Sequence, residues 1–142
     1  MSNTISRFDG EHRFLSNFWP STVLPPTLEH HYQASKTCLP ELKWQIMRAA
    51  TPGEAKRLGR TARLVTTLTW DDFKYWLMHD LVTKKFTEVS LAQRLMATGS
   101  EELVEGNTWH DNYWGRCFCA RCACEVGRNN LGQILMNVRK SL

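Results

Sequence analysis

The chain has 142 residues and a formal net charge of +4, a length at which one domain can bury enough surface to fold without disulfides or metals. Hydrophobic residues make up 42% and charged residues 23% of the chain, and no run approaches the roughly 20 apolar residues of a membrane-spanning helix. This composition predicts a soluble globular protein with a single domain over residues 1–142, and it excludes an integral membrane protein.

Location and partner class are constrained by charge and cysteine usage. The segment before Glu11 is polar and has no apolar run after a basic stretch, so we expect no secretory signal and a cytoplasmic location. Five cysteines without an export signal favour free thiols over a disulfide framework. Basic residues are scattered, as at Lys56, Arg57 and Arg60, which favours small anionic ligands over a nucleic-acid duplex.

The first elements alternate turn formers with capped helices. Residues 8–26 mix aromatic residues with Ser, Asn and Pro, which predicts irregular or short extended structure. Thr27 is a suitable N-cap for a helix that runs toward Lys36. Pro40 suits the first position of a second helix, whose inward residues are predicted to be Leu42, Ile46 and Met47.

A third helix has the clearest start signal. Thr51, Pro52 and Glu54 supply an N-cap, a first-position proline and a capping-box acid, so residues 52–60 are predicted to be helical. Gly59 weakens the last turn of this helix, because glycine is a poor helix former.

The longest helix is predicted to start at Thr69, where Asp71 and Asp72 lie at the positive end of the helix dipole. Apolar residues recur in it every four positions, which predicts an inward stripe of Phe73, Leu77 and Leu81.

The remaining chain combines two helices with irregular structure. Ser90 with Gln93 begins a helix that closes at Gly99, and Leu103–Val104 is predicted to be a short strand. The segment Gly106–Arg128 lacks a helical stripe and reads as a long structured loop, a type that is often functional. A terminal helix follows, with one face formed by Leu131, Leu135, Val138 and Leu142. The predicted class is therefore α+β, predominantly α-helical, with a few short strands.

Two segments carry polar residues that folding does not require, residues 27–36 and residues 107–115. On a helix, Glu29 and Gln33 lie within a turn or two of Tyr32 or Lys36, so an acid and a cation could face one pocket. A solvated stripe that only supports the helix fits the same spacing. Spacing alone leaves both interpretations open.

A metal site is the less favoured interpretation of the histidines and cysteines. His30 and His31 point to different helix faces, and with His110 they lack the i, i+4 pairing of a zinc protease. Zinc could be shared by the C-x-C-x-x-C-x-C cluster, although structural sites usually pair two separated knuckles. Free thiols without a metal, and no cofactor, are expected; the zinc alternative would use Cys117, Cys119, Cys122 and Cys124.

Tryptophans are a further set of candidates, because an indole ring can stack on a nucleobase. Trp70, Trp109 and Trp114 could each do so, although a tryptophan is more often part of a core. Their residue type alone does not separate these roles.

Taken in order, many short strings resemble the YbiA-like NADAR family. Phe14-Leu15-Ser16-Asn17-Phe18 is similar to the family's Leu-Ser-Asn-Phe motif, and Glu29–Lys36 is similar to its Glu-His-x-Tyr-Gln-Ala-x-Lys signature. The pattern continues through Ala55-Lys56, Gly59-Arg60, Trp70-Asp71, Met78, Lys85-Phe86, Leu95, Thr98-Gly99, Leu103-Val104-Glu105, Asp111, Trp114-Gly115, Asn129–Gly132, Leu135-Met136 and Val138-Arg139. The chain departs from it at Leu24-Pro25-Pro26, where the family has a Gly-rich turn, and the cysteine-rich stretch after Gly115 resembles only a subset of members.

The resemblance implies an N-glycosidase that hydrolyses the C–N bond between a phosphorylated ribose and a base. The implied substrates are riboflavin-pathway ribosylamino-pyrimidine phosphates or ADP-ribosylated guanine, so the partner is a small ribose phosphate or an ADP-ribosyl group, which could also be carried on nucleic acid. No membrane partner is expected, and the oligomeric state is left open. Two other classes are kept as alternatives: a non-catalytic module that binds ADP-ribose or NAD, and a zinc-stabilised nucleic-acid-binding protein.

Site residues follow from the resemblance and from the chemistry of base departure, which leaves positive charge on the sugar and calls for a carboxylate near C1. Glu29 is the first candidate for that role and Asp111 the second. Lys36 offers an alternative route, in which a lysine of lowered pKa forms a Schiff base with C1 of the ring-opened sugar. The substrate-binding candidates are Asn17, Phe18, Tyr32, Gln33, Arg60, Trp70, Trp114, Gly115 and Asn129, with Arg13 as a further phosphate partner.

Overall fold

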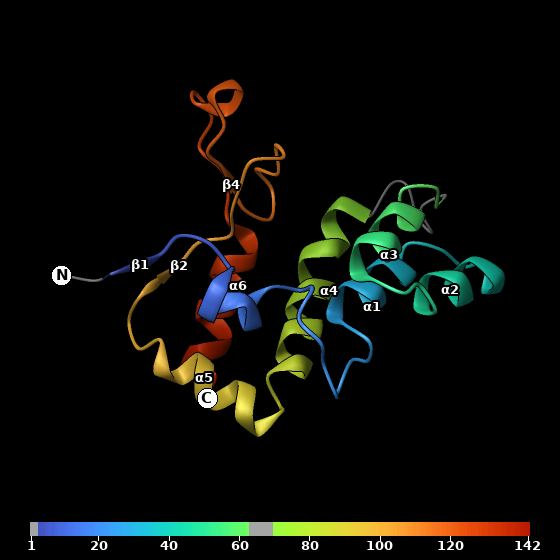
Figure 1. Ribbon diagram of the computed structural model, residues 1–142, viewed down its shortest axis with the longest axis horizontal. Coiled ribbons are helices and arrows are strands. Elements are labelled where there is room, and N and C mark those ends of the chain that lie inside the picture. The colour runs from blue at the N-terminus through green and yellow to red at the C-terminus, as the bar shows by residue number, and fades with distance from the viewer. Residues whose placement is uncertain (1–2, 63–69) are drawn as a thin grey trace. The chain divides into compact units, whose positions relative to one another are not determined.

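The computed structural model describes residues 3–62 and 70–142, and its contacts divide the chain into two compact units. One unit is Asn17–Glu88, and the other joins the residues up to Ser16 with Val89–Leu142. Helices dominate both units and the strands are short (Figure 1), which confirms the α+β, predominantly helical class. Among the described residues, no helix has the length and apolar character needed to cross a membrane.

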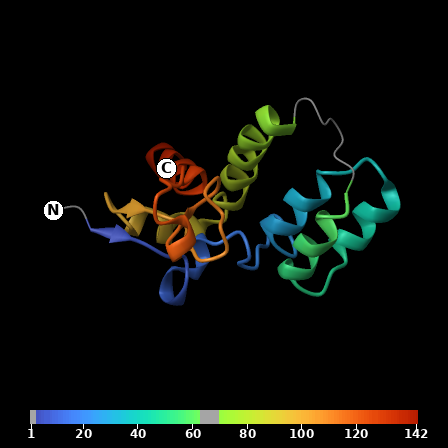
Figure 2. The ribbon, with the colours of Figure 1, turned by 90° about the horizontal axis from the view of Figure 1, so that it is seen from above.

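In the described part of the unit Asn17–Glu88, the named elements are helices, and a single antiparallel bridge joins Pro20 to Thr27. Its elements are α1 (Leu28–Ala34), α2 (Pro40–Met47), α3 (Pro52–Gly59) and α4 (Trp70–Lys85). The first three lie side by side (Figure 2) around a small apolar core of Ala34, Ile46, Ala49 and Ala55. Leu42 and Met47 pack against this core, so the inward face predicted for the second helix is confirmed.

Two predicted helix starts are confirmed by their caps. The Thr27 side chain accepts a hydrogen bond from the backbone N–H of His30, and Thr51 accepts one from the N–H of Glu54. Both bonds satisfy a first-turn donor that has no partner inside the helix. The start at Thr69 lies outside the described residues.

The buried face of α4 differs from the predicted stripe. Phe73 is 49% exposed, and the buried residues are Trp70, Met78, Leu81, Val82 and Lys85. Positions four apart drift by about 40° around a helix of 3.6 residues per turn, so Phe73 and Leu81 do not share one narrow face. The face that packs follows mixed steps of three and four residues.

Lys85 is a cationic residue inside this apolar face, at 1% exposure. Burial lowers the pKa of its amine to about 7, and the charge of Glu88 opposes that shift. An unfolded chain holds this proton up to the ordinary lysine pKa, so above pH 7 the unfolded state binds more protons than the folded state, and stability rises with pH. We expect Lys85 to add on the order of 1.5 kcal/mol to the free energy of unfolding between pH 7 and 8.5.

Denaturant unfolding of Lys85→Met at several pH values measures this effect. The variant should lose the rise, whereas the control Lys84→Met should keep it, because Lys84 is exposed and pairs with Asp80 at 3.1 Å. Equal pH slopes in the native chain and in Lys85→Met would show that the Lys85 amine remains charged in the folded protein.

The other unit combines helices with two short parallel strand pairs. Its helical elements are η1 (Gly10–Leu15), α5 (Val89–Ala97), η2 (Ala120–Cys122) and α6 (Asn130–Ser141). β1 (Thr4–Ile5) pairs with β2 (Glu102–Leu103), and β3 (Gly106–Asn107) pairs with β4 (Arg116–Cys117), both in parallel. Figure 1 shows β1 beside β2, and α6 also contacts β2.

Several predictions for this unit need correction. The strand predicted at Leu103–Val104 lies one residue earlier, and the segment predicted as loop contains β3, β4 and η2. Leu142 is 49% exposed, so the buried face of α6 is formed by Leu131, Ile134, Leu135 and Val138.

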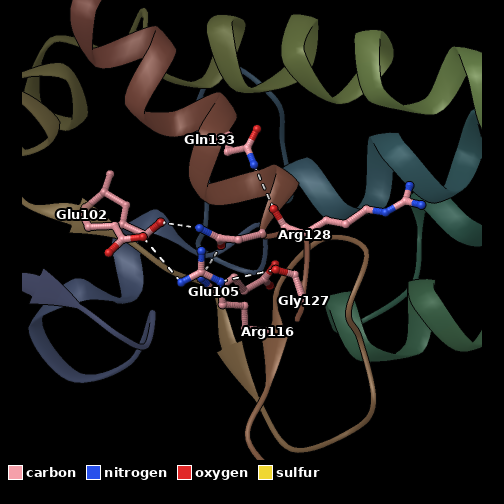
Figure 3. A network of polar contacts seen from close by, with 8 residues as sticks. Glu102, Glu105, Arg116, Gly127, Arg128 and Gln133 are labelled. Atoms are coloured by element: carbon pink, nitrogen blue, oxygen red, sulfur yellow. Dashed lines mark hydrogen bonds and ion pairs between the residues drawn. The ribbon is translucent and has the colours of Figure 1, made fainter. Parts of the chain in front are cut away.

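A polar network joins β2, β4 and the start of α6 (Figure 3). The guanidinium of Arg116 contacts Glu102 Oε1 at 3.5 Å and donates to the carbonyl of Gly127 at 3.3 Å, and Gln133 Nε2 donates to the carbonyl of Arg128 at 2.9 Å. Because Arg116 and Gly127 lie at the two ends of the cysteine-rich segment, these bonds close its base.

Candidate functional site

Glu29 is a buried acid in the unit Asn17–Glu88. It lies in the first turn of α1, is 6% exposed, and accepts a hydrogen bond at Oε1 from Gln33 Nε2 at 2.6 Å. The i, i+4 spacing in the sequence brings these two side chains together, as predicted for neighbours on a helix face. A solvated stripe is therefore the wrong interpretation of Glu29 and Gln33, since both are buried.

The protonation of Glu29 reflects opposing influences. Burial raises the pKa of its carboxyl, while the hydrogen bond from Gln33 and the positive charges of Lys56 and Lys36 lower it. Burial dominates, so the carboxyl holds a proton more tightly than an exposed glutamate does. Such a shift, produced by desolvation together with named charges, is typical of functional carboxyls.

Lys36 is the cation nearest in sequence to this acid. Burial lowers the pKa of its amine, the charge of Glu29 raises it, and the charges of Lys56, Lys74 and Arg60 lower it further. Its Nζ lies 5.4 Å from the centre of the Tyr32 ring. A lowered pKa gives the neutral amine that nucleophilic attack on a carbonyl requires.

Three aromatic rings pack in series near Glu29 and Lys36. The Tyr32 and Trp70 rings are 5.8 Å apart, and Trp70 lies 6.0 Å from Phe73. Tyr32 and Trp70 are buried. Trp70, one of the three candidate tryptophans, therefore packs against Tyr32 of α1, the helix that carries Glu29.

Asn17 and Phe18 connect the Leu-Ser-Asn-Phe motif to this helix. The backbone carbonyl of Asn17 accepts a hydrogen bond from the N–H of Glu29 at 3.1 Å. Its side-chain amide faces Met78 Sδ at 3.5 Å, which is a weak partner. Phe18 is 41% exposed, whereas Asn17 is buried.

Two residues that were not predicted as site residues position this helix. His30 is fully buried between the Thr27 hydroxyl, 2.8 Å from Nδ1, and the Ala49 carbonyl, 3.0 Å from Nε2. Gly59 of α3 lies against Gln33, and a Cβ at this position would come within 1.9 Å of Gln33 Oε1. His30 thus serves the fold, and Gly59 is needed for close approach of α3 to the Glu29–Gln33 pair.

Asp111 lies in the other unit and organises a turn. Its Oδ1 accepts hydrogen bonds from the backbone N–H groups of Tyr113 and Trp114 at 3.1 and 2.8 Å. The Trp114 ring packs edge-on against Tyr113, with centroids 4.7 Å apart. Gly115 is buried against the Glu105 carbonyl, 2.0 Å from where a Cβ would be, so its role is close packing.

Asn129 was predicted to bind substrate, but its amide is engaged by backbone. Its Oδ1 accepts from the N–H of Glu105 at 3.0 Å, and its Nδ2 donates to the carbonyl of Leu103 at 2.8 Å. With 1% exposure and a left-handed backbone, Asn129 positions the loop ahead of α6. The two predicted phosphate partners, Arg13 and Arg60, are exposed.

The cysteines do not group as the C-x-C-x-x-C-x-C spacing suggests. Cys117, Cys119 and Cys122 gather around His110, whereas Cys124 is exposed and lies outside that group. Cys124 lies outside the group because η2 ends at Cys122 and the residues that follow are exposed.

Comparison with known proteins identifies the family. A family model described as the NADAR domain matches residues 6–142. The chain belongs to the NADAR family. This NADAR chain is 32% identical over 151 residues to the N-glycosidase YbiA of Escherichia coli, covering 100% of this chain and 91% of that protein. The NMR structure of E. coli YbiA matches it with a TM-score of 0.80 at 32% identity, over 99% of this chain and 86% of that one.

Other relatives carry related names. An N-glycosidase of Nostoc punctiforme is 39% identical over 124 residues, 82% of this NADAR chain and 73% of that protein. A riboflavin biosynthesis protein of Vibrio vulnificus is 36% identical over 140 residues, which cover 94% of this chain but 36% of that protein. The NADAR chain therefore spans little more than a third of the Vibrio protein, and most of the length of the N-glycosidases.

Proposed function

We propose that this NADAR protein is an N-glycosidase that hydrolyses the C–N bond between a phosphorylated ribose and a base. The observation that carries the proposal is the buried Glu29 carboxyl, held by Gln33 at 2.6 Å and surrounded by lysine charges. Relatives named N-glycosidase support it. A small ribose phosphate as substrate, with a cytoplasmic location, fits the five free cysteines, since thiols stay reduced in that compartment.

The chemistry requires a negative charge next to C1 of the ribose. As the base leaves with the bonding electron pair, positive charge develops on the sugar, and a carboxylate in a desolvated site stabilises it. Over the whole reaction, water supplies hydroxide to C1 and a proton to the departing nitrogen. Glu29 is the group that we assign to this carboxylate, and Lys56, whose charge acts on Glu29, is suited to hold the phosphate.

Lys36 offers a covalent route to the same products. Its amine, whose pKa is lowered, attacks C1 as the C–N bond to the base breaks, and the base takes up the proton that the amine loses. The sugar ring then opens to give a Schiff base, which water hydrolyses to release the sugar and the amine. We expect borohydride, added during turnover, to fix the sugar on Lys36 as a secondary amine, which peptide mass spectrometry detects. Lys36→Arg keeps the charge without the nucleophile and should give neither adduct nor turnover.

The alternative route is direct attack by water on C1, with Lys36 acting only as a cation. A Lys36→Arg variant that keeps native turnover, together with absence of an adduct in the native chain, would assign that route.

Asp111→Asn is a second comparison, because an amide oxygen can still accept from Tyr113 and Trp114. Native turnover in Asp111→Asn would limit Asp111 to organising its turn.

Substrate profiling tests the proposed function itself. A panel of ribosylamino-pyrimidine phosphates, NAD, ADP-ribose and ADP-ribosylated guanine, free and on an oligonucleotide, should include at least one compound from which free base is released. Calorimetry on the same panel separates the second candidate function. Saturable binding without base release would assign a module that binds ADP-ribose or NAD without cleaving it.

A further inference from the structure

A compact group of metal-ligating side chains lies in the unit that contains α6, outside the Glu29 helix. His110, Cys117, Cys119 and Cys122 each offer one ligand atom, and all four atoms lie within 4.8 Å of one another. The cluster combines three potential thiolates with an imidazole, a donor set that suits zinc. It uses no residue to which the proposed glycosidase chemistry assigns a step.

The distances fit a tetrahedral metal ion. His110 Nδ1 lies 3.3 Å from the sulfur of Cys119, 3.4 Å from that of Cys122 and 4.0 Å from that of Cys117. With Zn–S bonds of about 2.3 Å and Zn–N bonds of about 2.0 Å, a tetrahedron separates nitrogen from sulfur by about 3.5 Å. The measured distances lie on both sides of this value.

Asparagine side chains fix the backbone around His110 and Cys117. Asn107 Oδ1 accepts from the N–H groups of Trp109 and Asp111, which flank His110. His110 itself has a φ of 69°, a left-handed conformation that is uncommon outside glycine. Asn112 Oδ1 accepts from the N–H of Cys117 at 2.9 Å. These bonds aim His110 back toward the cysteines, even though it lies in a loop seven residues before Cys117.

The two other ligands come from a short turn. The carbonyl of Cys119 accepts from the N–H of Cys122 at 3.1 Å, so η2 places both sulfurs on the same side. This Cys-x-x-Cys turn is the usual knuckle of a structural zinc site. Hydrogen bonds of Arg116 close the base of the segment (Figure 3), and His110 Nδ1 lies close to the sulfurs of Cys119 and Cys122 within it.

We propose that His110, Cys117, Cys119 and Cys122 bind one structural zinc ion that holds the loop between β3 and α6 in its folded form. Four protein ligands fill a tetrahedral site, whereas a catalytic zinc keeps a position open for water. The role is therefore to order the loop that also carries Asp111 and Trp114. Cys124 is not a ligand, so this site differs from a four-cysteine cluster.

The metal content of the full chain tests the site. Protein purified without chelators from zinc-supplemented medium should contain one zinc ion per chain by elemental mass spectrometry. His110→Ala and Cys119→Ser should lose most of it, at least five-fold. The matched controls Cys124→Ser and Cys38→Ser, which remove exposed thiols, should retain it. Iron in place of zinc, a metal-free native chain, or loss in Cys124→Ser with retention in His110→Ala would overturn the proposal.

Alkylation of the native chain gives a second readout that needs no variant. Iodoacetamide should alkylate Cys38 and Cys124 quickly, and it should alkylate Cys117, Cys119 and Cys122 at least ten-fold more slowly. Removal of the metal by phenanthroline should abolish this difference in rate. Protection of Cys124 together with Cys117, Cys119 and Cys122, or protection that phenanthroline leaves unchanged, would contradict a zinc site made of one histidine and three cysteines. A disulfide among them would be seen as alkylation only after reduction, and it would also overturn the proposal.

Discussion

The Glu29→Gln variant is expected to release base at least about 100-fold more slowly than the native chain while unfolding at a higher temperature. The loss of activity follows from removal of the negative charge that the sugar cation requires. The substitution nearly preserves size, and the new amide oxygen can still accept from Gln33 Nε2. The loss would therefore report on chemistry and not on packing.

The gain in stability follows from the sign of the pKa shift at Glu29. Burial raises the pKa of this carboxyl in the folded chain, so between the unfolded and folded values the folded state binds more protons. The free energy of unfolding that Glu29 contributes therefore falls as pH rises through that window. A glutamine side chain is neutral and avoids the free-energy cost of a buried negative charge. The variant should therefore be more stable than the native chain at pH 7, and the difference should disappear near pH 4, where Glu29 is protonated in both the folded and the unfolded state.

Thermal unfolding at the two pH values, together with a base-release assay, checks both halves of this result. Glu41→Gln is the matched control, because it makes the same charge change at an exposed position of α2 and should leave turnover native. A Glu29→Gln variant that turns over normally would remove Glu29 from the mechanism. One that is less stable at pH 7 would show that the buried carboxylate is well compensated.

Local signals explain which parts of the fold could be predicted from the sequence. The caps at Thr27 and Thr51 depend on a side-chain oxygen and an N–H three residues later, so neighbouring residues contain all the information. The pairing of Glu29 with Gln33 depends on helix spacing in the same way. These features were predictable because no distant segment decides them.

Long-range contacts explain what could not be predicted. Strands β3 and β4 are two residues each, too short to show a period, and their pairing depends on the loop that brings them together. The amide of Asn129 bridges to Leu103 and Glu105, 26 and 24 positions away, and no spacing rule reveals such a bond. His110 joins the cysteines through a left-handed backbone that a histidine rarely adopts.

Gly59 illustrates the same limit at the site itself. From the sequence, it is a weak point in the last turn of a helix. In the structure, its lack of a side chain lets α3 lie against Gln33, whose Nε2 donates to Glu29. The family string Gly59-Arg60 thus has a physical reason that only the contact between two helices supplies.

Gly59→Ala is accordingly expected to harm both stability and activity, although alanine is the better helix former. The added Cβ would lie 1.9 Å from Gln33 Oε1 and 2.8 Å from its Cδ, so Gln33 or α3 must move. Overpacking of a buried contact costs about 1 to 3 kcal/mol. Displacement of Gln33 also removes a hydrogen bond that lowers the pKa of Glu29. The acid limb of the activity profile should therefore move to higher pH.

Gly53→Ala provides the control within the same helix. A Cβ at Gly53 meets only Thr51 Oγ1, at an ordinary 3.9 Å, so this variant should gain up to about 0.5 kcal/mol from helix propensity and keep the native pH profile. Urea unfolding and base release across pH measure both variants. If Gly59→Ala behaved like Gly53→Ala, Gln33 would have room to move while keeping its hydrogen bond to Glu29. In that case α3 would have no part in positioning the acid. Opposite responses from two glycines six residues apart can only come from what each one faces, which for Gly59 is the amide that orients the proposed catalytic carboxyl.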